Sequence, residues 1–315
     1  MSLLTIAQQV ASSIPLAVPT AIVGQSDDTS ILLLACAQDE GEALSRKPSA
    51  GWLEQQVEYD FTTVAFPNLS GTLANTGAGG VGVITGLSST TGIVAKTFYV
   101  TGTNVPANTT VASVDSATQV TLTQAGTGTG AGTFTFAKSD YALPSDYNRL
   151  IMGSLWDRSR YWEMRGPLSP HQWQLFKSSI IGRSTILRRW RVRRIASTVV
   201  LSIDPAPTDN GAALVFEYVT NAWCQSASGT AQTKWAADTD TGIIDEYLMR
   251  LGVKWRMLRR LGMAYQDEMA EYLGEVEKTI ARNGGAPVIP ITGGAWDGLS
   301  SPGIVLSGVP YDVGG

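Results

Sequence analysis

The stretch 242–282 constrains the fold most, because its apolar residues recur at spacings of three and four along its whole length. That period places them along one side of a helix. Asp238 and Asp240 are candidate caps before the stretch, and Asn283-Gly284-Gly285 follows it as a stop signal. The pattern predicts one long amphipathic helix or two stacked helices, with Gly262 as the candidate break. The apolar positions are Ile244, Tyr247, Leu248, Leu251, Trp255, Leu258, Leu261, Tyr265, Met269, Tyr272, Leu273, Val276 and Ile280.

A helical stripe of this length needs a surface that covers it, either elsewhere in the chain or on another subunit. The 315 residues are enough to bury a substantial core and to form two or three domains. Only 16% of them are charged, which is low for a soluble monomer and favours a protein that buries surface against other chains. The net charge of −4 provides no overall attraction to nucleic acid or to an anionic membrane.

Residues that carry catalysis or bind metals are sparse in this chain. Cys36 and Cys224 are the only cysteines, which excludes a disulfide framework and a thiolate metal site. His171 is the only histidine, so a histidine metal cluster is excluded and we expect a surface or capping role for it. The acidic clusters Asp39-Glu40 and Asp267-Glu268-Glu271 have helical spacing and are expected on solvated faces. We therefore expect no catalytic residues, no cofactor and no metal, and a protein that is not an enzyme.

Targeting and membrane-spanning signals are also missing from the sequence. The N-terminus lacks the basic region, long apolar core and cleavage site of a signal peptide. No uncharged apolar run approaches the roughly 18 residues that a membrane-spanning helix needs. The glycine-rich runs lack the Gly-Lys-Ser/Thr ending of a phosphate-binding loop. We expect a protein that is assembled in the cytoplasm and has no membrane partner.

Two helices and one extended segment are predicted near the N-terminus. The first helix occupies 2–13, with Ser2 as its cap, and prolines end it. The second helix begins at Ser26-Asp27-Asp28 and continues to about Lys47. Residues 54–64 have the character of an extended segment.

Residues 71–137 differ in composition from the rest of the chain. Lys96 and Asp115 are their only charged residues, and Gly, Thr, Ser, Ala and Val dominate. Alternating runs predict strands, and we interpret the region as an inserted all-β module; the alternative is a flexible low-complexity linker. Removing the module would bring Phe66 close to Tyr141. The alternating runs are 92–101, 109–115, 119–123 and 133–136.

The region after the module combines a short helix with a small β-sheet. A helix is predicted from the Pro167-Leu168-Ser169-Pro170 turn to about Ser179. The small sheet is expected at 185–223, where two strands at 185–203 are followed by a loop and by a strand at 213–219.

The last segment, 284–315, is rich in Gly and Pro and is predicted to be an extended arm that attaches to another surface. Its short apolar runs are the candidate contacts with a partner. The candidate interface residues in the arm are Val288, Ile289, Ile291, Ile304, Val305 and Leu306.

Two clusters of basic residues are further candidates. The cluster on the predicted long helix is expected at an interface, where arginines pair with acidic surfaces of neighbouring chains. The other cluster surrounds Trp190 and is a candidate for the DNA channel or for an interface; we favour protein contacts over direct phosphate contacts. The first cluster contains Arg250, Lys254, Arg256, Arg259 and Arg260. The second contains Arg188, Arg189, Arg191, Arg193 and Arg194.

Several segments in a fixed order carry a resemblance to a known family. They read LPSDY, LWDR, GPLSP, then FEY with a following Trp, then DTD, DE and LGVKWR. In this order they resemble the head-to-tail adaptor proteins of tailed bacteriophages, which are also called head completion or connector proteins. The resemblance covers roughly 1–67 and 139–283, and it leaves out the β module, which resembles Thr/Gly/Val-rich modules of phage virion proteins.

The resemblance implies a structural role in the virion neck, between capsid and tail. Members of this family form a ring of twelve copies below the portal protein. The ring contacts the portal and its own neighbours, extends the DNA channel, and offers a docking face to tail, nozzle or tail-fibre proteins. The resemblance also implies non-specific contact with genomic DNA as a candidate role.

The sequence therefore predicts an α+β fold made of three parts. The adaptor core is expected at 1–70 and 138–283, as a helical assembly domain with a long C-terminal helix and a small antiparallel β region. The inserted module occupies 71–137 and the C-terminal arm 284–315. Two alternatives remain open: a carbohydrate-binding or decoration protein of the virion that acts through the β module, and a cell-wall hydrolase.

Overall fold

The computed structural model describes residues 1–47, 52–75, 80–178, 187–195 and 197–283. These residues form two compact units. The described part of the first unit consists of 1–47, 52–58, 145–151 and 217–283, and that of the second lies within Tyr59–Pro144 and Met152–Phe216. In the described residues the chain crosses between the units four times: within β1 (Gln56–Thr62), on either side of 145–151, and within β14 (Ala213–Thr220).

The predicted fold class, a helical assembly domain with a small β region and an inserted module, is wrong. In the described residues, helices and strands contribute about equally, and most of the architecture is antiparallel sheet. The prediction missed strands of only two to four residues, which are too short to show an alternating pattern. They include β9 (Tyr147–Leu150), β10 (Trp156–Asp157), β11 (Trp162–Glu163), β15 (Cys224–Gln225), β16 (Ala231–Gln232) and β17 (Thr241–Gly242).

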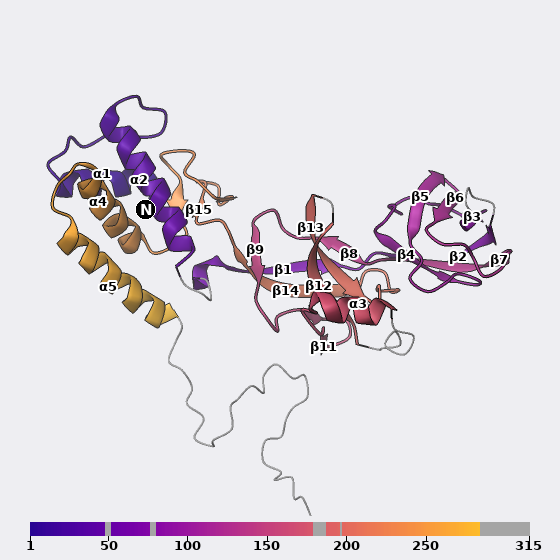
Figure 1. The fold of residues 1–315 in the computed structure, drawn as a ribbon. Helices are drawn as coiled ribbons and strands as arrows, with labels where there is room; N and C mark the ends of the chain where they lie inside the picture. Colours follow the sequence, from indigo (N-terminus) through magenta and orange to yellow (C-terminus); the bar gives the residue numbers. More distant parts are fainter. Residues whose placement is uncertain (48–51, 76–79, 179–186, 196, 284–315) are drawn as a thin grey trace, which may run out of the picture. The chain divides into compact units, whose positions relative to one another are not determined.

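Four helices build the first unit, and the helix at its centre is α4 (Figure 1). α4 contacts the other three helices, so its side chains are buried on most sides, whereas α5 lies at the periphery. Trp52, Trp223 and Trp235 complete the apolar core. The helices are α1 (Leu3–Ser13), α2 (Asp28–Ser45), α4 (Glu246–Arg260) and α5 (Gln266–Asn283), and a 3-10 turn, η1, occupies Leu53–Gln55.

The predicted long C-terminal helix is two helices, α4 and α5, separated at Gly262. Gly262 adopts a left-handed backbone conformation with φ of 70°. Its N–H donates to the carbonyl of Arg259 at 3.2 Å, and the N–H of Met263 donates to the carbonyl of Leu258 at 3.0 Å. This is the Schellman pattern that ends a helix, and it favours glycine because a Cβ is strained at positive φ.

The start signals predicted for the first two helices are present. Ser2 precedes α1 and its side chain accepts a hydrogen bond from the N–H of Thr5 at 3.3 Å. Asp27 precedes α2 and accepts from the N–H of Ser30 at 2.9 Å. Local capping signals therefore determined where both helices begin.

The second unit contains a six-stranded antiparallel sheet with the order β4-β7-β2-β3-β6-β5 (Figure 1). Its core consists of aliphatic side chains and phenylalanines, among them Phe98, Phe134 and Phe136. The strands predicted within 92–136 are present, and the linker alternative is excluded for the described residues. The strands are β2 (Ala65–Ala74), β3 (Val83–Thr85), β4 (Phe98–Gly102), β5 (Val111–Ser116), β6 (Gln119–Leu122) and β7 (Gly130–Lys138).

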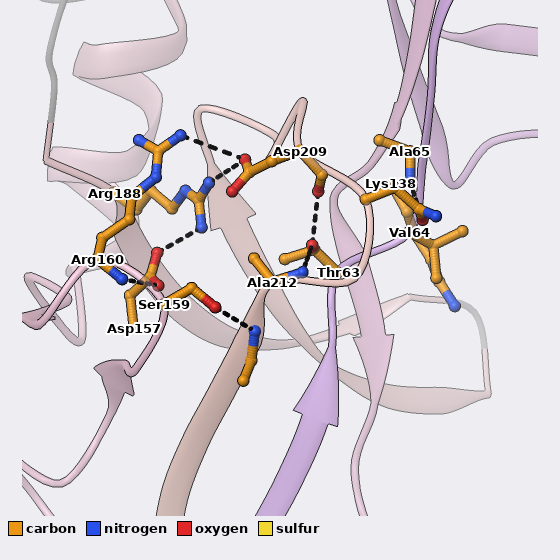
Figure 2. Close-up of polar contacts among 12 residues, drawn as sticks. Thr63, Val64, Ala65, Lys138, Asp157, Ser159, Arg160, Arg188, Asp209 and Ala212 are labelled. Atoms are coloured by element: carbon orange, nitrogen blue, oxygen red, sulfur yellow. Dashed lines mark hydrogen bonds and ion pairs between the residues drawn. The ribbon is translucent and has the colours of Figure 1, made fainter.

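The chain segments that enter and leave this sheet lie next to each other. Ala65 is the register partner of Ala137, and the N–H of Lys138 donates to the carbonyl of Val64 at 2.9 Å. Figure 2 shows Val64, Ala65 and Lys138 close together. The chain therefore enters and leaves the six-stranded sheet at one place, as an insertion requires.

Among the described residues, the rest of the second unit consists of short sheets and one helix. Strand β12 (Arg189–Ile195) pairs with β13 (Thr198–Asp204), which pairs with β8 (Asp140–Ala142). In the second unit, β10 lies between β14 and β11, and β14 also neighbours β1. The helix α3 (Pro170–Ser178) begins with a capping box, in which Ser169 and Gln172 exchange hydrogen bonds between side chain and backbone. None of the described helices has the length and apolar character needed to cross a membrane.

Candidate interface: the arginines of helix α4 and strand β12

Helix α4 carries the first predicted basic cluster, and a buried carboxylate holds one of its arginines. Arg256 Nε donates to Glu40 Oε2 at 2.6 Å, and the Tyr272 hydroxyl donates to Glu40 Oε1. Glu40 is fully buried, so the expectation that it lies on a solvated face is wrong. Burial raises the pKa of Glu40, while the hydrogen bonds from Tyr272 and Arg256 and the Arg256 charge oppose that shift.

Glu40 also explains a glycine in the middle of α4. A Cβ built on Gly252 would lie 2.1 Å from Glu40 Cδ, so no other residue leaves room for the carboxylate. A glycine in a helix interior lowers helix stability. The function of Gly252 is to admit α2 and the Glu40 carboxylate against the α4 backbone.

Three more basic side chains of the cluster have partners within the first unit. Lys254 Nζ forms an ion pair with Glu268 at 2.9 Å, and Arg260 Nη2 forms one with Asp39 at 2.6 Å. Arg250 donates to Gln9 Oε1 at 3.2 Å, and its guanidinium lies 5.1 Å from the centroid of the Tyr247 ring.

Arg259 is the exception in the first cluster. It is exposed near the C-terminal end of α4, and its guanidinium has no hydrogen-bond or ion-pair partner among the residues that the structure describes. Leu261 and Met263 follow it and are 38% and 41% exposed. We call Arg259, Arg260, Leu261, Gly262 and Met263 the α4–α5 corner.

A hollow of about 310 Å³ opens beside this corner. The guanidinium of Arg256 also lies 4.8 Å from the centroid of the Trp255 ring. Trp255 is only 7% exposed, and its indole N–H has no partner among the described residues. We call the hollow the arginine hollow, and its lining residues are Asp39, Trp255, Arg256, Arg259 and Arg260.

The second predicted cluster begins with Arg188, which is buried rather than available to a partner. Only 4% of its side chain is exposed, and its guanidinium lies between Asp157 and Asp209 (Figure 2). Arg188 Nη1 donates to Asp157 Oδ2 at 2.6 Å, and the other end of the guanidinium pairs with Asp209. Arg160 joins the network through an ion pair of 3.4 Å with Asp209 and a backbone hydrogen bond to Asp157.

The remaining arginines of this cluster lie along β12. Arg193 donates to Ser202 Oγ at 2.6 Å and to Asp140 Oδ1 at 3.1 Å, and it is therefore neutralised within the unit. The Arg189 guanidinium lies 3.6 Å from the centroid of the Phe176 ring. Arg191 is half-buried and Arg194 is exposed. The two basic clusters thus belong to different units, and the structure gives them different surroundings.

The predicted arm residues Val288, Ile289, Ile291, Ile304, Val305 and Leu306 lie outside the described residues. His171 is exposed in the first turn of α3. In the part of the chain that the structure describes, no group of three or more His, Cys, Asp or Glu residues is arranged to hold a metal ion.

Acidic residues in the family-like segments hold distant parts of the first unit together. The Asp146 carboxylate of LPSDY accepts from the hydroxyls of Tyr218 and Thr220, at 2.9 and 2.8 Å. The Asp238 carboxylate of DTD accepts from the backbone N–H groups of Ile22 and Val23. These residues therefore stabilise the fold. Asp238 was predicted as a helix cap, but the cap of α4 is Asp245.

A second hollow, of about 490 Å³, lies beside Asp146 and Asn221 and is lined largely by residues 231–236. Its Gln232 Oε1 is shielded from water and has no partner among the described residues. The Asp146 carboxylate beside this hollow accepts hydrogen bonds from the hydroxyls of Tyr218 and Thr220.

The comparisons with known proteins give no relative: no protein-family model matches this chain, and the search of curated proteins found no significant match.

Proposed function

We propose that this chain is a structural virion protein that forms a ring between the portal and the tail of a tailed phage. The observation that carries the proposal is the α4–α5 corner, where Arg259, which has no partner among the described residues, lies beside the exposed Leu261 and Met263. Arginine, methionine and apolar side chains are enriched in the cores of protein–protein interfaces. The corner is therefore a surface suited to contact with another protein.

The family-like segments support the same proposal. Asp146, Asp238 and the Ser169–Gln172 capping box all make contacts that fix the backbone. These residues stabilise the backbone and do not form a binding surface. A fold in common with the adaptor family would therefore explain why the segments resemble that family in sequence and in order. The proposal therefore rests on a resemblance in the residues that hold the fold together.

A ring places one requirement on the surface of each copy. Each subunit must offer two different patches, one for each neighbour, and the rotation between neighbours must close the ring. In the first unit, α5 is peripheral and α4 ends at the exposed corner, so these two elements provide distinct patches. The portal and the tail proteins would contact the two open faces of such a ring, and the channel would accommodate DNA.

The proposal is tested by measuring the native mass of the full chain with and without the portal protein encoded in the same genome. We expect the chain to join the portal as a complex of twelve copies per portal ring. A portal protein from an unrelated phage serves as the matched control and should retain no bound chain. A chain that ignores its own portal would disprove the connector function.

A further inference from the structure

The arginine hollow has an unbalanced charge. Three guanidinium groups, from Arg256, Arg259 and Arg260, are balanced by only two carboxylates. Glu40 accepts from Arg256, and Asp39 pairs with Arg260. One positive charge, that of Arg259, therefore remains in a hollow of about 310 Å³.

The single excess positive charge determines which kind of anion the hollow can bind. One carboxylate would neutralise the excess charge, and the planar guanidinium of Arg259 matches its two oxygens. A nucleic acid strand would bring several phosphates toward Asp39, which lines the hollow and is half-exposed. The chain as a whole is also acidic, with a net charge of −4, so it does not attract a polyanion.

A surface with the complementary charge exists on the same chain. Helix α5 carries five acidic residues and two basic ones. Glu268 and Glu275 have ion-pair partners, whereas Asp267, Glu271 and Glu277 are exposed. Within one copy, none of these three carboxylates pairs with Arg259.

We propose that the arginine hollow binds a carboxylate of the exposed α5 face, supplied by a second copy of this chain. The inference rests on the proposed ring and names one contact within it. The contact is head-to-tail, because hollow and acidic face are different surfaces, so each copy donates one and receives the other.

The test uses two charge-reversed full-length chains. One carries Arg259→Glu, and the other carries Asp267→Lys, Glu271→Lys and Glu277→Lys. Sedimentation velocity at low ionic strength measures self-association, alone and on portal rings, and circular dichroism checks the folding of each variant. Each variant alone should self-associate about 100-fold more weakly than the wild type, because like charges then meet across the contact.

Mixing the two variants gives the decisive result. In an equimolar mixture the reversed hollow meets the reversed face, and the unchanged hollow meets the unchanged face, so association should return to near the wild-type level. Arg46→Glu, which makes the same charge change on an exposed side chain outside the hollow, should leave association unchanged. A mixture that stays dissociated, an Arg259→Glu variant that associates normally, or a wild type that never self-associates would overturn the proposed contact.

The outcomes also separate this contact from the proposed function. If the chain binds its portal as a ring and Arg259→Glu assembles equally well, the connector function stands and the proposed contact is wrong. If the chain self-associates through the hollow but does not bind its portal, the proposed contact stands and the connector function is wrong.

Discussion

The two arginine clusters have similar composition, but individual arginines within them differ in whether their charge is matched inside the chain. In the second unit, Arg188 and Arg193 are neutralised by Asp157, Asp209 and Asp140. In the first unit, Arg259 lies near the end of α4 and has no ion-pair or hydrogen-bond partner among the described residues. A count of arginines therefore does not identify an interface, because what matters is whether each charge is already matched inside the chain.

The difference follows from burial. A buried guanidinium must be paired, since desolvation of an unpaired charge is very unfavourable. Arg188 is 4% exposed and Asp157 is fully buried, so each requires the other. Arg259 remains hydrated in a single copy, so it can stay unpaired until a partner approaches.

The largest effect is expected for Arg188→Ala. This change leaves Asp157 buried without its cation and should lower the free energy of unfolding by about 3–5 kcal/mol. Urea unfolding of the full chain measures the loss. Arg259→Ala is the matched control from the other cluster and should change stability by less than about 0.5 kcal/mol. Equal losses for the two variants would remove the distinction between the clusters.

A smaller effect is expected for Gly252→Ala. The new Cβ would lie 2.1 Å from Glu40 Cδ, so α2 and α4 must separate, and stability should fall by about 1–3 kcal/mol. Gly274→Ala in α5 is the control, because a Cβ there has nothing within 4 Å. It should stabilise the chain by about 0.5–1 kcal/mol, through helix propensity alone. A stabilising Gly252→Ala would show that the Glu40 carboxylate is not packed on the helix.

The pH dependence of stability tests Glu40 itself. Its pKa in the folded chain is raised above the ordinary 4.5, so above pH 4.5 the folded state holds a proton that the unfolded state has released. The contribution of Glu40 to stability is therefore present below pH 4.5 and declines as the pH rises through its folded pKa. Urea unfolding at several pH values should show this decline in the wild type and not in Glu40→Gln. Glu42→Gln, at a more exposed position of α2, should retain the wild-type profile.

Features determined by neighbouring residues could be predicted from the sequence. The caps Ser2 and Asp27 are local signals, and both helices begin where they indicate. Gly262 was the candidate break in the stretch 242–282, and α4 ends at it. The alternating runs of the module predicted four of its six strands, because alternation needs only a few adjacent residues.

Features determined by distant residues could not be predicted. Glu40 was expected in solvent because helical spacing shows which residues share a side and not what covers that side. Its partner Arg256 is 216 positions away, and no local pattern connects the two. The same reason explains the wrong fold class: two-residue strands such as β10 and β15 are too short to show alternation, and each also pairs with a strand outside its own hairpin, β14 and β17 respectively.

The smallest effect is expected when the six-stranded sheet is removed. Ala65 and Ala137 are register partners, so a short Gly-Ser turn can join them without moving the flanking strands. Because the arginine hollow and the α4–α5 corner belong to the other unit, portal binding and self-association should remain within a few-fold of the wild type. Native mass measurements with the portal test this expectation. Loss of portal binding in a deletion variant that still folds would instead favour a carbohydrate-binding or decoration role, with the six-stranded sheet as the part that acts.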